Sequence, residues 1–215
     1  MTRSTLRTNI RYLLAETATD FYTDQKLNVA IYEAMIDMAK KTKAIRGTTT
    51  TSSVAGTAEY AYPSYCVGIN DITWGTTEEW LNPVSVSDLD RDYPGWRQTS
   101  AGHRVTPEYF LTGYTTNYYR LYPAPEDTTS HKVYWWGIPA DLASDTSSPT
   151  FNEAYHMGLV YYATWWLIMA DPDADESKQK TANFWRSEYE RYCIDYGVVL
   201  ASIGRGPHYI LSTSP

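Results

Sequence analysis

The sequence predicts an α+β protein in which a helical bundle carries an antiparallel β insertion in the middle of the chain. Apolar residues recur at helical spacing near both ends of the chain. In the middle, short runs in which residue character alternates at a period of two are separated by turn-forming residues. We expect residues 1–53 and 143–203 to form the bundle core and residues 54–142 to form the β-rich insertion. Residues 204–215 contain Pro207 and cannot continue a helix, so we expect an extended C-terminal tail.

The N-terminal part of the bundle is predicted to be a short helix followed by a long one. The short helix spans residues 3–15, with Leu6, Ile10 and Leu13 on one side. The long helix begins after Thr23, whose hydroxyl can accept hydrogen bonds from amides of the first turn. Lysines gather at its C-terminal end, where the helix dipole favours cations.

Three arginines of the short helix, Arg3, Arg7 and Arg11, are spaced four residues apart and would share one face. A solvent-exposed helix face is the simpler interpretation of this pattern. Contact with DNA or with an acidic partner is the alternative, because guanidinium groups bind phosphates and carboxylates. The sequence leaves both interpretations open.

The β insertion is predicted from short runs rich in Tyr, Val, Ile and Trp that are separated by Gly and Pro. Strands are expected near residues 56–63, 66–74, 80–86, 109–112, 118–122 and 132–137. Residues 87–106 are polar and contain Pro94 and Gly95, so we expect them to form an excursion outside the core.

The C-terminal part of the bundle is predicted to be an antiparallel hairpin of two long helices. Asn152 can cap the first helix and Asp173 the second, and Pro172 separates them. The first helix is expected to bury a stripe formed by Tyr155, Leu159, Tyr162, Trp166 and Met169. The second is expected to bury a stripe formed by Ala182, Trp185, Tyr189, Tyr192 and Tyr196.

Composition and charge argue against several classes of protein. The formal net charge of −7 argues against a general nucleic-acid coat. The four histidines and two cysteines show no metal-ligand or disulfide spacing, so we expect no metal and no cofactor. No catalytic motif is recognisable, and no apolar run is long enough to span a membrane. We therefore expect a protein that is not an enzyme and has no membrane partner.

Aromatic side chains make up 15% of the chain, and several tryptophans lie in the β insertion. Adjacent residues of a strand point to opposite faces, so Trp135 and Trp136 require cover on both faces of their sheet. The protein core and a neighbouring subunit would provide this cover, and a sugar-binding face is the alternative. A carbohydrate- or receptor-binding tail module is accordingly the second function that we consider, and a glycosidase the third.

Several short motifs, taken in order, resemble those of head–tail connector (adaptor) proteins of tailed bacteriophages. An aromatic-Thr-Asp-x-x-Leu opening of the long helix is matched at residues 22–27, and a G-T-x-x-Y-x-x-P strand at residues 56–63. The pattern continues with Pro-Ala-Asp-Leu at 139–142, Tyr-His-x-x-Leu-x-Tyr-Tyr-Ala at 155–163 and an aromatic-x-x-x-Tyr helix at 185–189. The resemblance covers about residues 5–200, and residues 87–106 and 204–215 depart from the pattern.

The resemblance implies a structural protein of the virion, located at the head–tail junction and made in the cytoplasm of the host bacterium. It would form a homo-oligomeric ring, commonly a dodecamer, beneath the portal protein and extend the DNA channel. It would also offer a platform to a downstream tail or nozzle protein and to tail fibres. Double-stranded DNA would pass through without sequence-specific binding, and an acidic lumen would repel phosphates and let the genome slide.

In related connectors a terminal segment reaches into the portal, so the tail is a candidate contact with the portal or with a neighbouring copy. The residues that we expect to make this contact are Arg205, Pro207, His208, Tyr209, Ile210 and Leu211. Their aliphatic and tyrosine side chains suit addition to an exposed edge strand. Together with Trp135 and Trp136, they form the predicted protein interface.

Overall fold

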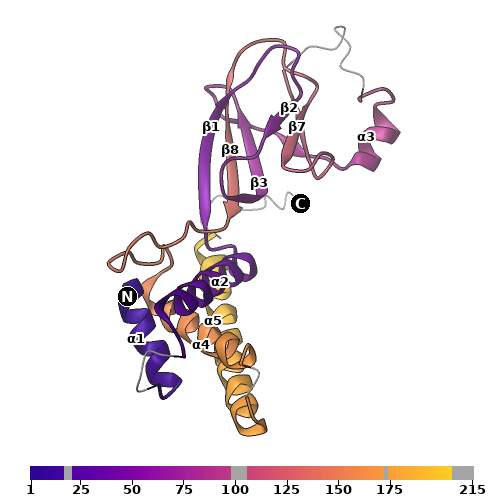
Figure 1. Ribbon diagram of the computed structural model, residues 1–215. Helices are drawn as coiled ribbons and strands as arrows, with labels where there is room; N and C mark the ends of the chain where they lie inside the picture. Colours follow the sequence, from indigo (N-terminus) through magenta and orange to yellow (C-terminus); the bar gives the residue numbers. More distant parts are fainter. Residues whose placement is uncertain (17–20, 98–105, 172–173, 205–215) are drawn as a thin grey trace. The chain divides into compact units, whose positions relative to one another are not determined.

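The computed structural model describes residues 1–16, 21–97, 106–171 and 174–204. The chain divides into two compact units (Figure 1). The helical unit comprises Met1–Ile45 and Ile138–Pro215, and the β unit comprises Arg46–Gly137. The predicted tail contacts at 205–211 lie outside the described residues.

The helical unit contains, in its described part, α1 (Arg3–Leu13), α2 (Asp24–Thr42), α4 (His156–Met169) and α5 (Glu176–Gly204). The Thr23 hydroxyl caps α2 by accepting a hydrogen bond from the Lys26 amide, as the sequence predicts. Asn152 caps a short 3₁₀ turn, η1 (Glu153–Tyr155), which leads into α4. The predicted cap of the last helix, Asp173, lies outside the described residues.

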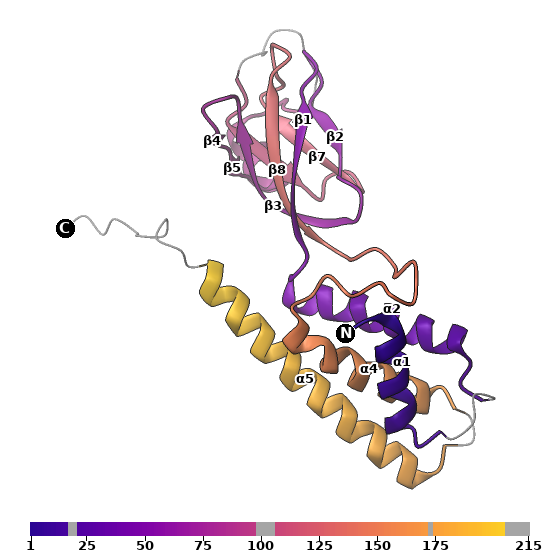
Figure 2. The ribbon, with the colours of Figure 1, turned by 90° about the vertical axis from the view of Figure 1, so that its left-hand side faces the viewer.

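Helices α4 and α5 form the predicted antiparallel hairpin (Figure 2). Aromatic rings fill the space between them: Tyr155 stacks on Tyr196 with ring centroids 4.0 Å apart, and Tyr161 stacks on Trp185 at 5.2 Å. Gly158 makes the close approach possible, because a Cβ atom there would lie only 3.1 Å from the Cβ of Tyr192. The hairpin therefore depends on one small residue among large rings.

The predicted stripe on α4 is only partly correct. Leu159 is fully buried, but Met169 is 51% exposed, and Tyr162 and Trp166 are half-buried. The residues of α4 that are buried in the core cluster are Leu159, Val160, Ala163 and Leu167. Helix α4 contacts α1, α2 and α5, so it is buried on more than one side. Its buried residues therefore do not form a single aromatic stripe. On α5 the prediction is better, since Ala182, Tyr189 and Tyr196 are buried.

The β unit contains two four-stranded sheets with the strand orders β1–β8–β3–β4 and β2–β7–β6–β5. The strands are β1 (Arg46–Ser52), β2 (Glu59–Ala61), β3 (Cys66–Trp74), β4 (Glu79–Trp80), β5 (Asn82–Pro83), β6 (Tyr109–Thr112), β7 (Tyr118–Tyr122) and β8 (Ser130–Gly137). The β5–β6 pair is parallel, and the other strand pairs in the described residues are antiparallel. Strand β8 lies between β1 and β3 (Figure 1).

Residues from both sheets form one core in the β unit. Its buried members are Tyr60, Ile72, Trp74, Leu81, Phe110, Tyr119, Leu121 and Val133. His131 is 1% exposed within this aromatic core; it stacks on Trp74 and forms a 2.6 Å hydrogen bond between Nε2 and the Tyr119 hydroxyl. Burial lowers the pKa of His131 to about 4, so the imidazole is neutral at pH 7.

A short helix, α3 (Val86–Asp92), follows β5 and belongs to a second, smaller core of the β unit. Leu89 is fully buried and Trp96 is 4% exposed, and both pack with Leu111. The Arg120 guanidinium lies 5.0 Å from the Trp96 ring centroid, a favourable cation–π geometry. The expectation that this segment lies outside the core is therefore wrong for its described part.

The predicted fold class, a helical bundle with an antiparallel β insertion, is wrong. The middle of the chain has two sheets, a helix, a parallel strand pair and its own cores. The sequence interpretation missed β1, which begins at Arg46, because its residues are Gly, Thr and Ser after the first position. A strand without apolar alternation gives no period-two signal.

We expect the stability of the β unit to depend on His131 between about pH 6.5 and pH 4. An unfolded histidine binds a proton below about pH 6.5, whereas folded His131 does so only near pH 4. The free energy of unfolding should therefore be highest above pH 6.5 and fall as the pH is lowered through this window. Urea unfolding at pH 7 and pH 5 should show the effect, and His131→Gln should reduce the difference; an equal difference in both proteins would contradict it.

Candidate interaction surfaces

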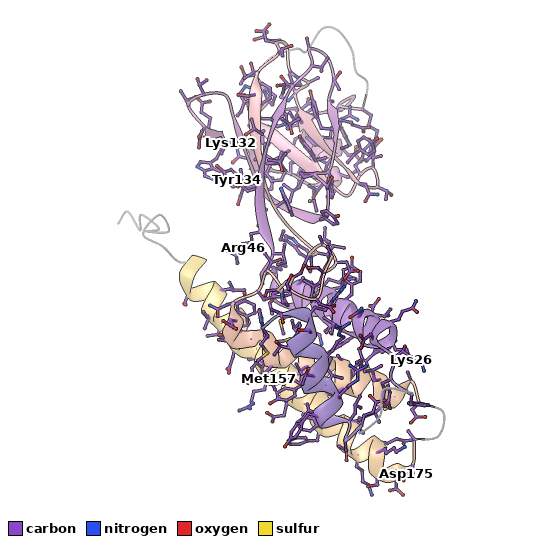
Figure 3. All side chains as sticks on the ribbon, turned by 60° about the vertical axis from the view of Figure 1, so that its left-hand side comes forward. Lys26, Arg46, Lys132, Tyr134, Met157 and Asp175 are labelled. Atoms are coloured by element: carbon purple, nitrogen blue, oxygen red, sulfur yellow. The ribbon has the colours of Figure 1, made fainter. Side chains whose placement is uncertain are left out.

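The outer face of the β1–β8–β3–β4 sheet is the first candidate surface. Along β8, His131 and Val133 are buried in the core, so Lys132, Tyr134 and Trp136 occupy the opposite face. The antiparallel register sets Arg46 opposite Trp136 on the neighbouring strand. Figure 3 shows Lys132, Tyr134 and Arg46 along one side of the sheet.

Aromatic rings are prominent on this face. Trp80 of β4 is 64% exposed, and its ring centroid lies 5.4 Å from that of Tyr134. Trp136 lies over Gly68 of β3, where any side chain would collide with the indole. An exposed tryptophan beside tyrosine is typical of the anchors that proteins use at interfaces.

The outer face also carries one ion pair and one partly buried carboxyl group. The Lys132 ammonium pairs with the Glu78 carboxylate, which holds the pKa of the lysine above its usual value. Asp71 lies opposite Tyr134 in the strand register, and partial burial raises the pKa of its carboxyl group. The face therefore combines aromatic rings with the Lys132–Glu78 ion pair.

The structure places the two predicted interface tryptophans on opposite sides of the sheet. Trp135 packs against the core of the β unit, and its Nε1 donates a hydrogen bond to Thr49 Oγ1 at 3.0 Å. A side chain at Gly47 would collide with the Trp135 ring, so this glycine makes room for it. Trp136 lies on the outer face, and its contact with another chain stays a prediction.

Arg3, Arg7 and Arg11 do share one side of α1, but that side is not exposed to solvent. Their side chains are only 17%, 10% and 19% exposed. Each guanidinium pairs with carboxylates of its own unit. The arginine side of α1 is therefore mostly buried, and its simpler interpretation as a solvent-exposed face is wrong.

Arg7 is the central member of this ion-pair cluster. It lies 3.0 Å from Asp24 at the start of α2 and 2.8 Å from Asp145 in the loop before α4. Arg3 reaches the same Asp145, and the two arginines lower the pKa of that carboxyl group. The cluster therefore joins three segments that are distant in sequence. DNA contact by these arginines stays a prediction, and these ion pairs already engage their guanidinium groups.

The outer side of α5 is a second candidate surface. Several of its apolar residues are exposed: Phe184, Ile194, Val198 and Val199. Ile194 and Val198 are one helical turn apart and therefore lie on the same side of the helix. This strip lies on the side opposite the buried Tyr189, Cys193 and Tyr196.

Two aspartates of α3 form hydrogen bonds within the same segment of the chain. Asp88 bonds the Ser85 hydroxyl at the start of α3, and Asp90 accepts hydrogen bonds from Trp96 Nε1 and Arg97. Among the residues described by the structure, no group of three or more His, Cys, Asp or Glu side chains could hold a metal ion. None of the described helices is long and apolar enough to cross a membrane.

Comparison with known protein families identifies the class of the chain. A family model described as SU10 adaptor protein matches residues 1–201, which include the β unit and the helical unit as far as residue 201. The chain therefore belongs to this family of phage head–tail adaptor proteins, as the sequence motifs suggest. A search of curated proteins gives no significant match. The family match supports a structural role and location in the virion.

The Arg7 cluster should contribute measurably to the stability of the helical unit. Arg7→Met removes the cation and leaves Asp24 and Asp145 without one of their partners. Because both carboxylates are more than half exposed, we expect a loss of about 1–2 kcal/mol. Urea unfolding followed by circular dichroism measures this loss.

The matched control for Arg7→Met is Lys180→Met. Lys180 pairs with Glu176 on the exposed surface of α5, with side chains 75% and 82% exposed. This substitution should change the unfolding free energy by less than about 0.5 kcal/mol. Equal effects of the two substitutions would show that the arginine cluster has no special role.

Proposed function

We propose that this phage adaptor forms a ring beneath the portal, extends the DNA channel and provides the platform for tail components. The family match over residues 1–201 carries the proposal. The proposed partners are further copies of the chain, a portal protein and a downstream tail or nozzle protein. Tail fibres are a further proposed partner, and double-stranded DNA would pass through without sequence-specific binding.

The two candidate surfaces support an assembly of this kind. The outer sheet face exposes Trp80 beside Tyr134, and α5 exposes Ile194 and Val198. A cyclic ring needs two different surfaces on each copy, because its contacts run head to tail. Two separate apolar surfaces, one on each unit, are consistent with that requirement.

The net charge of −7 supports an acidic channel lining. Acidic side chains repel the phosphate backbone, so a genome could slide without adhering, whereas Lys and Arg would retain it. The paired state of Arg3, Arg7 and Arg11 is consistent with this proposal, since their charges are already compensated by carboxylates. A lumen lined by Lys and Arg would contradict it.

Sugar binding is the second candidate function, and the exposed Trp80 ring is the observation that favours it. A sugar-binding face usually presents ring platforms, and Trp80 with Tyr134 could form one. Three other tryptophans of the β unit belong to the interior or its edge: Trp74, Trp96 and Trp135. We therefore prefer the adaptor function.

Mass photometry of the purified chain with the portal protein of the same phage tests the proposal. The wild-type chain should bind the portal as a multi-copy ring, whether or not it is monomeric alone. Trp80→Ser should weaken this assembly about tenfold or more, because an exposed tryptophan that becomes buried at an interface is a common hot spot. Its folding should be unaffected, since the ring is 64% exposed.

The matched control is Tyr12→Ser, which removes an aromatic ring that is 83% exposed on α1. This variant should assemble like the wild type, because Tyr12 lies outside both candidate surfaces. A chain that binds oligosaccharides and stays monomeric with the portal present would overturn the adaptor proposal in favour of the sugar-binding one.

A further inference from the structure

The two sheets have four edge strands in the described residues, and three of them are very short. Strands β4 and β5 contain two residues each, and β2 contains three. Because β4 pairs only with Thr73 and Trp74, it leaves most of β3 uncovered, but two β-bulge-like register shifts interrupt that part of β3. Strand β5 also includes Pro83, which has no backbone N–H. Short strands and prolines are the usual means by which proteins prevent edge-to-edge pairing.

The fourth edge, β1, has none of these protections. It contains seven residues, Arg46–Ser52, and pairs with β8 without any register shift. It has no proline, and only its first residue is charged. Such a regular and nearly uncharged edge is a ready template for another strand.

The direction of the backbone groups on β1 follows from its hydrogen bonds. Just beyond β1, the Ser53 amide donates to the Thr129 carbonyl at 2.8 Å, on the β8 side. Because successive peptide groups of a strand point to alternate sides, the N–H and C=O groups of Thr48, Thr50 and Ser52 point away from β8. These groups can therefore pair with an added strand.

We propose that β1 accepts residues 209–214 of a neighbouring copy as an additional strand. This inference rests on the proposed ring, in which the next copy must offer a different segment from β1. Among the described residues, β2, β4 and β5 are only two or three residues long, and two register shifts interrupt the part of β3 that β4 leaves uncovered. The run Tyr-Ile-Leu-Ser-Thr-Ser at 209–214 is uncharged, has no internal proline and nearly matches β1 in length.

Strand addition would give affinity through the main chain and leave selectivity to alternate side chains. Tyr209 and Leu211 would lie on one face of the extended sheet, with Ile210 on the other. The outer face already presents Tyr134 and Trp136, so an apolar added residue there would extend an existing aromatic surface.

The first test blocks the open edge without breaking the sheet. Thr50→Pro removes an N–H group that points away from β8, so the β1–β8 hydrogen bonds are retained. Thr50→Val keeps this N–H and the β-branched shape, and is the matched control. On the portal, Thr50→Pro should reduce ring assembly at least tenfold, whereas Thr50→Val should assemble like the wild type. Thermal unfolding checks that both variants are folded.

The second test changes the added strand in the full-length chain. Replacing residues 209–214 with six Gly and Ser residues should reduce ring assembly to the level of Thr50→Pro, because this run has little strand propensity. Replacing them with alternating Val and Thr should restore assembly, because the main-chain hydrogen bonds supply the affinity.

The outcomes separate this inference from the proposed function. Loss of the ring in both Thr50→Pro and the Gly/Ser variant, with recovery in the Val/Thr variant, supports the added strand. A full ring in either impaired variant overturns it and leaves the adaptor function standing. If the Gly/Ser variant alone loses portal binding, the tail contacts the portal and the inference is wrong. A wild-type chain that never forms a ring on the portal overturns both.

Discussion

The alternation of side chains along β8 is the constraint on which the β unit depends. This strand pairs with β1 on one side and β3 on the other. Val133 and His131 face the core, whereas Tyr134 and Trp136 form the outer face. A slip of one residue would bury Lys132 and Trp136 and expose the core residues, so the register fixes both the core and the candidate surface.

The helical unit depends on a different constraint, which is the close approach of α4 to its neighbours. Gly158 and Ala163 keep α4 narrow, and the large rings of Tyr155 and Tyr161 then stack on α5. The Tyr189 hydroxyl bonds the Asp37 carboxylate and so joins α5 to α2. The outer side of α5 still exposes Ile194 and Val198.

The sequence predicted the features that depend on neighbouring residues. The Thr23 cap, the α4–α5 hairpin and the family motifs are all local patterns, and they were recognised.

The predictions failed where distant residues decide the structure. Arg3 and Arg7 pair with Asp145, which no helical spacing could indicate. Strand β1 was missed because it is polar on both faces. Its partner, β8, lies at the other end of the β unit in the sequence. The sequence alone does not indicate that Trp135 faces the core and Trp136 faces away from it, because this depends on the register with β1.

The central claim is that the outer sheet face and the open edge of β1 are contact surfaces in the virion. A cryo-electron microscopy structure of the chain assembled on its portal tests this claim most directly. We expect a further strand about 4.8 Å from β1, and the rings of Trp80 and Trp136 covered by another chain. An assembled ring in which β1 has no neighbour and both rings face solvent would contradict it.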